Sequence, residues 1–330
     1  MPSPALVAAI DIGAGLIACL GTRALIPVLR RAAVIDRPNE RSSHAVPTPR
    51  GGGIAPVGAI LLAWMALIAA DVGASGLWLV LVGAVLLAVV SWFDDTRGLS
   101  PASRLFAQIA AVICGLLAAI PTGFVFQGWL PAWLDILAAA LAWLWFVNLF
   151  NFMDGIDGLA GSETAAIALG LVLFASIGIG QDPDLAALSG AVGLVAVGFQ
   201  VWNWAPARIF LGDVGSVPLG YLLGFLLLQT AARGHWKIAL ILPLYFLADA
   251  TLTLLRRLSR GERIWQAHRQ HFYQRAVQSG LGHAAVTSRV IAANLLLIGC
   301  GWAAENGARV YALAAAVAIV IVLLASLSRS

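Results

Sequence analysis

The sequence predicts an all-α, polytopic membrane protein with about eleven transmembrane helices. Hydrophobic residues make up 61% of the 330 positions and charged residues only 11%, whereas soluble domains average about 25% charged residues. The apolar residues form continuous stretches close to the roughly 20 residues that a helix needs to cross a bilayer. Strands of a membrane β-barrel would alternate apolar and polar residues, so we expect these stretches to be helices.

Eleven apolar segments are candidates for membrane spans, and no internal repeat or low-complexity linker divides them. We therefore expect one integral-membrane domain over residues 1–330. The first basic residue, Arg23, comes late in the first segment, which predicts a retained span rather than a signal peptide. The predicted spans are Ala5–Leu29, Ile54–Ala70, Leu77–Phe93, Leu105–Ile120, Leu130–Val147, Thr164–Gly180, Leu185–Trp202, Val217–Ala231, Ile238–Leu255, Val286–Trp302 and Val310–Leu327.

The distribution of arginine and lysine predicts which side of the membrane each loop faces. Alternate loops are rich in arginine, whereas the loops between them hold only Arg233, Lys237 and Arg309. Cytoplasmic loops carry the excess of basic residues, so we expect the N-terminus outside and the C-terminus in the cytoplasm. This rule also explains the net charge of +4 without a nucleic-acid partner, and none is expected.

Asp94 and Asp95 follow the third apolar segment, on the predicted cytoplasmic side. Adjacent carboxylates repel each other unless a cation lies nearby, and Mg²⁺ prefers oxygen ligands together with phosphate oxygens. A solvated helix end would explain the pair equally well. Taken alone, the pair therefore leaves a magnesium and phosphate site as one of two interpretations.

A richer motif begins at the end of the fifth segment and reads Asn148-Leu-Phe-Asn151-Phe-Met-Asp154-Gly-Ile-Asp157-Gly-Leu. The two amides are three residues apart, and so are the two carboxylates, so each pair shares a face if the helix continues. The glycines allow the backbone to turn or to approach a ligand closely. So many polar residues within one short segment favour a functional site over a simple end of a helix.

The segment Phe210-Leu-Gly-Asp213-Val-Gly-Ser216 stands just before the eighth span. Backbone amides at the start of a helix, with a carboxylate between glycines, suit a phosphate with a bound metal. The alternative is an ordinary N-cap, because Ser216 could cap the next helix.

Two basic loops on the same side complete the set. The segment His268-Arg-Gln-His271-Phe-Tyr-Gln-Arg275 has two histidines and two arginines, and guanidinium groups bind phosphate in a bidentate manner. The first loop ends in Pro-Thr-Pro-Arg50 followed by three glycines, which let the backbone pack closely as the second span begins. It is not an ATPase P-loop, because GxxxxGK[ST] is absent.

Several other polar residues are expected to be structural, and one remains unassigned. Asp249 lies within the ninth span and either supports that helix or lines a groove for a lipid phosphate. The residues expected to be structural lie at span ends or in outer loops: Asp11, Asp71, Asp135, Asp182, Asp184, His235, His283 and Glu305.

Taken together and in order, these blocks resemble the polyprenyl-phosphate N-acetylhexosamine-1-phosphate transferase family. The match runs from about Asp36, through the Arg-Ser-Ser-His and Pro-Thr-Pro-Arg-Gly-Gly-Gly segments, to about Arg275. The resemblance implies that a prenyl phosphate, expected to be undecaprenyl phosphate, attacks a UDP-linked N-acetylated sugar. Sugar-1-phosphate moves to the lipid and UMP leaves, at the cytoplasmic face of a bacterial inner membrane.

The resemblance also implies roles for individual residues. Asn151 and Asp213 look like ligands of Mg²⁺, or of Mn²⁺ in its place. Asp94, Asp95 and Asp154 are then expected in the catalytic set, with Asp94 and Asp95 beside the prenyl phosphate. The set also includes Asp157 as a nucleoside contact and His271 as a diphosphate contact, with further substrate contacts from Asn148, Arg50, Arg269, His268 and Arg275.

Two departures from the family pattern concern the substrate. The muramoyl-pentapeptide enzymes carry consecutive histidines where this chain has His268-Arg-Gln-His271, and lysine at the position of Arg97. The first loop looks most like members that begin O-antigen or other surface polysaccharides. We therefore expect UDP-GlcNAc, UDP-GalNAc or a 6-deoxy N-acetylamino sugar as donor, contact with membrane lipids, and a homodimer as one assembly. The alternative function is a transporter or flippase for a phosphorylated lipid or nucleotide sugar.

Overall fold

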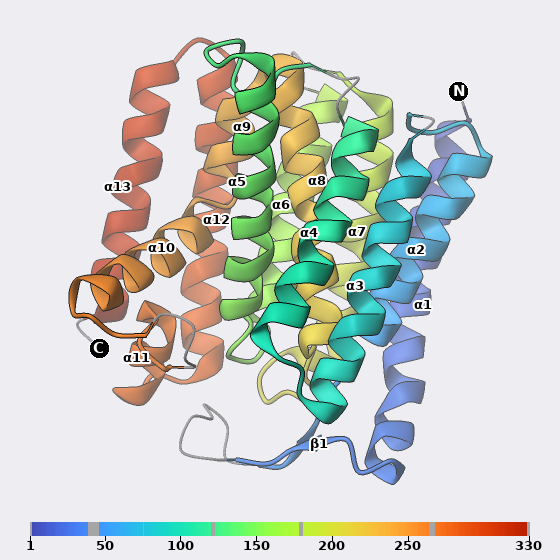
Figure 1. Cartoon of the computed structure of the whole chain (residues 1–330), viewed down its shortest axis with the longest axis vertical. Helices are drawn as coiled ribbons and strands as arrows, with labels where there is room; N and C mark the ends of the chain where they lie inside the picture. Colours follow the sequence, from blue (N-terminus) through green and yellow to red (C-terminus); the bar gives the residue numbers. More distant parts are fainter. Residues whose placement is uncertain are drawn as a thin grey trace.

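The computed structural model describes residues 2–38, 46–74, 76–119, 123–177, 181–263 and 268–328, in which the chain is mostly helical. The long helices pack side by side into one bundle, and the two termini lie at opposite ends of it (Figure 1). The Arg-Ser-Ser-His segment of the predicted family pattern lies outside the described residues. The helices are α1 Pro4–Arg31, α2 Ile54–Ala69, α3 Leu77–Arg97, α4 Pro101–Ala119, α5 Ala132–Phe152, α6 Leu159–Ile177, α7 Pro183–Asn203, α8 Asp213–Thr230, α9 Trp236–Ile241, α10 Leu244–Ser259, α11 Phe272–Gln278, α12 His283–Glu305 and α13 Arg309–Ser328.

Within the described residues, nine helices are long and apolar enough to cross a membrane, which confirms a polytopic membrane protein. One of the nine runs from Asp213 to Ile241 and joins α8 to α9 through the π-helix η2, Ala231–His235. α2 is shorter, at 16 residues, which corresponds to about 24 Å at 1.5 Å per residue. A total of eleven spans and the cytoplasmic orientation remain predictions.

The ninth predicted span, Ile238–Leu255, is not one helix. α9 ends at Ile241 and α10 begins at Leu244, with Pro243 between them. Proline has no N–H to donate and its ring clashes with the preceding turn, so it interrupts a helix. α10 then runs obliquely to the long helices, toward the end of the bundle that carries α11 (Figure 1).

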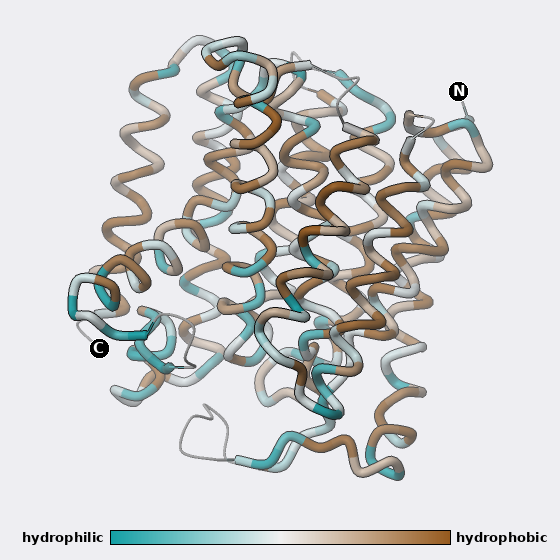
Figure 2. The backbone as a smooth tube through the Cα atoms, viewed as in Figure 1, coloured by the Kyte–Doolittle hydropathy of each residue, from teal (hydrophilic) through white to brown (hydrophobic). Residues whose placement is uncertain are grey.

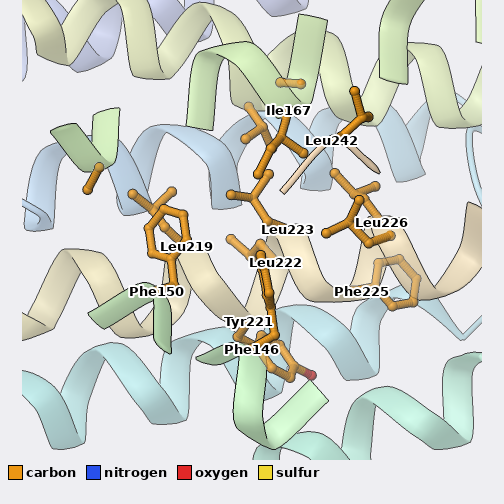
Figure 3. Close-up of a cluster of buried hydrophobic side chains, with 14 of the residues drawn as sticks. Phe146, Phe150, Ile167, Leu219, Tyr221, Leu222, Leu223, Phe225, Leu226 and Leu242 are labelled. Carbon is orange, nitrogen blue, oxygen red and sulfur yellow. The ribbon is translucent and has the colours of Figure 1, made fainter. Parts of the chain in front are cut away.

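α8 is the central helix of the bundle. It contacts α2, α3, α4, α5 and α6, and every residue from Val214 to Thr230 is buried. Side chains from α5, α6 and α8 meet in the apolar cluster of Figure 3. In the same core the Trp143 ring stacks on Tyr221 at 4.8 Å, and the Trp143 indole donates to the Tyr221 carbonyl at 2.9 Å. These contacts hold the middle of α8 against α5.

One end of the bundle gathers the polar motifs. The chain leaves α1, α3, α5 and α7 at this end, enters α2, α4, α6 and α8 there, and forms a short antiparallel hairpin of β1 (Ile35–Asp36) and β2 (Thr48–Pro49) (Figure 1). Hydrophilic residues concentrate toward this end, whereas the middle of the bundle is mainly hydrophobic (Figure 2). The topology therefore brings motifs from five separate loops to one face.

Candidate active site

The first basic loop and the segment before α8 meet backbone to backbone. The N–H groups of Gly52 and Gly53 donate to the carbonyls of Phe210 and Leu211, both at 2.8 Å. A Cβ atom on Gly53 would lie 2.1 Å from the Cα of Gly215, closer than any two carbon atoms can pack. Glycine is needed here for close approach of two backbones, as the sequence predicted for this loop.

Asp95 and Arg50 hold the start of α8. The two oxygens of Asp95 accept from the backbone N–H groups of Asp213 at 3.2 Å and Val214 at 2.9 Å. The Arg50 guanidinium lies 2.8 Å from Asp95 Oδ1 and 2.9 Å from Asp213 Oδ1. The Asp95 side chain is fully buried, while Arg50 is 37% exposed. Arg50 therefore bridges two carboxylates and still presents an open side to a ligand.

This arrangement corrects two expectations for the segment before α8. The helix begins at Asp213, four residues before the predicted span, and its N-cap is Gly212 rather than Ser216. The Gly212 backbone has φ +72°, a conformation that favours glycine. The N–H groups expected to bind phosphate are not free for that role at Asp213 and Val214, because Asp95 accepts both.

The two adjacent aspartates face different partners. Asp94 accepts from the Leu99 N–H at 2.7 Å and pairs with Arg104 at 3.0 Å, which fixes the turn between α3 and α4. Arg104 also reaches within 4.0 Å of Asp213 Oδ2. The two carboxylates are therefore paired rather than solvated, Asp94 with Arg104 and Asp95 with Arg50. Arg104 was not among the site residues predicted from the sequence.

The amides of α5 complete a pocket at the mouth of the bundle. The Ser216 hydroxyl donates to Asn151 Oδ1 at 2.5 Å, and Asn148 donates to Gln108 at 2.8 Å. Both amides line a pocket of about 150 Å³, together with Asp94, Arg104 and Asp213. The predicted shared helix face of Asn148 and Asn151 is confirmed, because α5 continues to Phe152.

The carboxylates of Asp154 and Asp157 do not share a helix face, because α5 ends before them. Asp157 accepts from the Ala207 N–H at 2.9 Å and lies 3.1 Å from Nδ1 of His283. The Thr287 hydroxyl donates to its carbonyl at 3.0 Å. These contacts fasten the loop between α5 and α6 to the start of α12, so His283, expected to be merely structural, supports the predicted site.

Asp154 lies near other carboxylates of the site. Burial, followed by the nearby carboxylates of Asp213, Asp95 and Asp157, raises the pKa of Asp154 from 3.8 to about 7, although Arg50 lowers it. Both burial and neighbouring carboxylates disfavour the ionised form of a carboxyl group, so a bound cation would be expected to favour ionisation of Asp154.

The histidine segment docks against the same loop. The Tyr273 hydroxyl donates to the Phe152 carbonyl at 2.9 Å, while the His271 ring pairs through Nδ1 with Asp249 at 3.1 Å. The His268 and His271 rings stack at 4.9 Å. Burial, with His271 and Arg257 nearby, lowers the pKa of His268 to about 4, so His268 adds no positive charge at neutral pH. Arg269 is half-buried and Arg275 is exposed.

The oxygen donors of this site fit a hard divalent cation in charge and chemistry. Among the described residues, no group of three or more His, Cys, Asp or Glu side chains is arranged around a metal position. The predicted ligands Asn151 and Asp213 nevertheless border one pocket, and amide and carboxylate oxygens suit Mg²⁺. The carboxylates of Asp94, Asp95, Asp154 and Asp213 outnumber the guanidinium groups of Arg50 and Arg104 that lie among them. Asp154, with its raised pKa, is partly protonated at neutral pH in the absence of a cation.

The fold and the site together define a polytopic membrane protein. A polar site at one end of its helix bundle holds guanidinium groups that can bind phosphate. Residues 77–231 match the model of glycosyl transferase family 4. The chain is 33% identical to phospho-N-acetylmuramoyl-pentapeptide-transferase of Synechococcus sp. (strain JA-3-3Ab), over 84% of this chain and 86% of the relative. It is 28% identical to a probable undecaprenyl-phosphate N-acetylglucosaminyl 1-phosphate transferase of Bacillus subtilis (78% and 75%). It is also 28% identical to decaprenyl-phosphate N-acetylglucosaminephosphotransferase of Mycobacterium tuberculosis (85% and 78%).

The chain therefore belongs to glycosyl transferase family 4, the polyprenyl-phosphate N-acetylhexosamine-1-phosphate transferases. The family predicted from the sequence is confirmed. The relatives give no support to the alternative of a transporter or flippase.

The glycine contact yields the first prediction. Replacing Gly53 with alanine places a methyl group against Gly215, and overpacking of this kind costs about 1–3 kcal/mol. We expect Gly53→Ala to lower the thermal unfolding midpoint in detergent by several degrees. Gly58→Ala is the matched control, because Gly58 lies in α2, the helix that Gly53 caps, and a Cβ there meets nothing within 4 Å. Equal midpoints for the two variants would contradict the backbone contact.

The environment of Asp154 yields the second prediction. The folded protein holds the Asp154 proton to about pH 7 and the unfolded chain only to about 3.8, so stability from this group is lost as pH rises through that window. In buffer that contains a metal chelator, the thermal unfolding midpoint of the wild type should fall more steeply between pH 5 and pH 8 than the midpoint of Asp154→Asn. Asp184→Asn, at the opposite end of the bundle, should keep the wild-type slope. Parallel curves for wild type and Asp154→Asn would contradict the placement of Asp154.

Proposed function

We propose that this protein transfers an N-acetylated sugar-1-phosphate from a UDP-sugar to undecaprenyl phosphate and releases UMP, at the cytoplasmic face of a bacterial plasma membrane. The observation that carries the proposal is the cluster in which Arg50 bridges Asp95 and Asp213 beside Asn151. It lies at the mouth of a membrane bundle, where a water-soluble donor and a lipid acceptor can meet.

The reaction requires charge neutralisation and positioning more than proton transfer. In phosphoryl transfer, electrostatic stabilisation and alignment supply most of the rate enhancement. The exposed sides of Arg50 and Arg104, at 37% and 39%, can each bind phosphate oxygens. When bound, Mg²⁺ would neutralise phosphate charge, held by Asp213 and Asn151 with Asp154 nearby.

Asp95 positions other groups in this proposal. Its buried carboxylate accepts from two backbone N–H groups and pairs with Arg50, which suits a support for Asp213 rather than a nucleophile. A lipid phosphate monoester is mostly dianionic at neutral pH, so it needs no general base. Asp94, which borders the pocket next to Arg104, is placed beside the acceptor phosphate.

The donor proposed is a UDP-N-acetylhexosamine without a peptide, with UDP-GlcNAc first and UDP-GalNAc or a 6-deoxy sugar as alternatives. Two relatives are named for N-acetylglucosamine and one for the muramoyl-pentapeptide, so sequence identity alone does not choose. The spacing of His268 and His271, which lacks consecutive histidines, supports the smaller sugar. The product would begin a surface polysaccharide such as O-antigen.

The third prediction concerns the reaction itself. Purified protein in detergent, with undecaprenyl phosphate, Mg²⁺ and UDP-GlcNAc, should release UMP, and a chelator should abolish the release. Asp213→Asn should lower kcat by roughly 100-fold or more, because it weakens both the cation site and the Arg50 bridge. Asp184→Asn should retain wild-type activity.

A panel of donors decides the substrate class. Release of UMP with UDP-N-acetylhexosamines and not with UDP-N-acetylmuramoyl-pentapeptide supports the proposal, whereas the reverse preference rejects the smaller sugar. UMP release by Asp213→Asn at the wild-type rate would reject the proposed role of Asp213 in the reaction. Uptake of a nucleotide sugar into sealed vesicles without UMP would support a transporter instead.

A further inference from the structure

Asp249 is a fully buried carboxylate in α10, a position that is costly unless its oxygens are paired. Its Oδ1 accepts from the backbone N–H of Phe272 at 3.0 Å, and its Oδ2 from that of Tyr273 at 3.3 Å. The hydroxyls of Tyr245 and Thr253 donate to the same carboxylate at 3.2 and 3.3 Å. One side chain of α10 therefore holds the first turn of α11.

The carboxylate also orients the ring of His271. Nδ1 of His271 lies 3.1 Å from Asp249 Oδ1, an oxygen that already accepts from Phe272. An acceptor oxygen requires a hydrogen on its partner, so Nδ1 carries the proton, and Nε2 is the nitrogen with which the ring can reach a ligand. The ring is only 2% exposed and lies between the rings of His268 and Tyr273. Its orientation is therefore set before any ligand arrives.

The helix that follows the ring, α11, packs beside the candidate active site. Tyr273, two residues beyond His271, donates to the Phe152 carbonyl. A Cβ at Gly155 would lie 2.1 Å from the Tyr273 hydroxyl, so α11 packs directly on the loop that carries Asp154. A substitution at Asp249 would therefore alter both the orientation of the His271 ring and the packing of α11.

We propose that Asp249 is a positioning residue of the transferase, which fixes His271 with Nδ1 protonated and Nε2 directed to the diphosphate of the donor. This inference rests on the proposed function and assigns a role to an acidic residue that the sequence left open. A fixed Asp–His pair keeps the ring in one orientation, with Nδ1 bonded to the carboxylate, and a ring that is also protonated at Nε2 can donate a hydrogen bond to a phosphate oxygen. Because the pair is preorganised, the contact requires little reorientation during the reaction.

The fourth prediction is a double-mutant cycle. Asp249→Ala and His271→Ala should each lower kcat on the order of 100-fold, the typical cost of losing one preorganised donor, with KM for the UDP-sugar changed far less. Because Asp249 acts through His271, the double variant should be no slower than His271→Ala. Thr253→Val, which removes another donor to the same carboxylate, should keep kcat within a few-fold. Independent, multiplicative losses would overturn the proposal.

A second measurement does not depend on activity. Selective ¹⁵N labelling of the five histidines, with His271→Gln to assign the signal, reports which ring nitrogen is protonated. Wild type should show a protonated Nδ1 at His271, and Asp249→Ala should shift the ring toward the Nε2–H tautomer. If Asp249→Ala does not fold, the wild-type spectrum still decides, because an unprotonated Nδ1 would overturn the inference. If no UDP-sugar yields UMP, the proposed function fails while the tautomer result still stands.

Discussion

The close contact between two glycine backbones is the constraint on which the site depends. Gly53 and Gly215 approach so closely that neither could carry a side chain without displacing the other segment. This contact places Arg50, which directly follows β2, beside Asp213 at the start of α8. Since α8 is buried from Val214 to Thr230, the core of the bundle supports Asp213 at the first position of this helix.

Charge balance links this junction to the rest of the site. Asp95 reaches from α3 to the N-terminus of α8, where a negative group also interacts favourably with the helix dipole. Arg50 then lies between two carboxylates, and burial, with the nearby carboxylates of Asp213 and Asp95, raises the pKa of Asp154. Carboxylate oxygens that suit a divalent cation, beside guanidinium groups that can bind phosphate, are the basis of the proposed transfer reaction.

Much of the fold could be predicted from the sequence, because continuous apolar stretches define the helices and arginine-rich loops define one face. The break at Pro243 could also have been predicted from the proline itself. The partners of Asp249 and Asp157 could not, because His271 lies 22 residues and His283 lies 126 residues further along the chain. Long-range pairs depend on how helices pack, and one sequence carries no local pattern for them. The order of the motifs selected the candidate site residues, but the separate ion pairs of Asp94 and Asp95 required the geometry.

The central claim is that segments far apart in the chain gather around one divalent cation. The most direct test is a structure of the purified protein with Mn²⁺, located by anomalous scattering. The account predicts one Mn²⁺ bound by oxygens of Asp213 and Asn151, with the Arg50 guanidinium moved away from the Asp213 carboxylate. Manganese bound elsewhere at saturating concentration, with Arg50 still bridging Asp95 and Asp213, would contradict it.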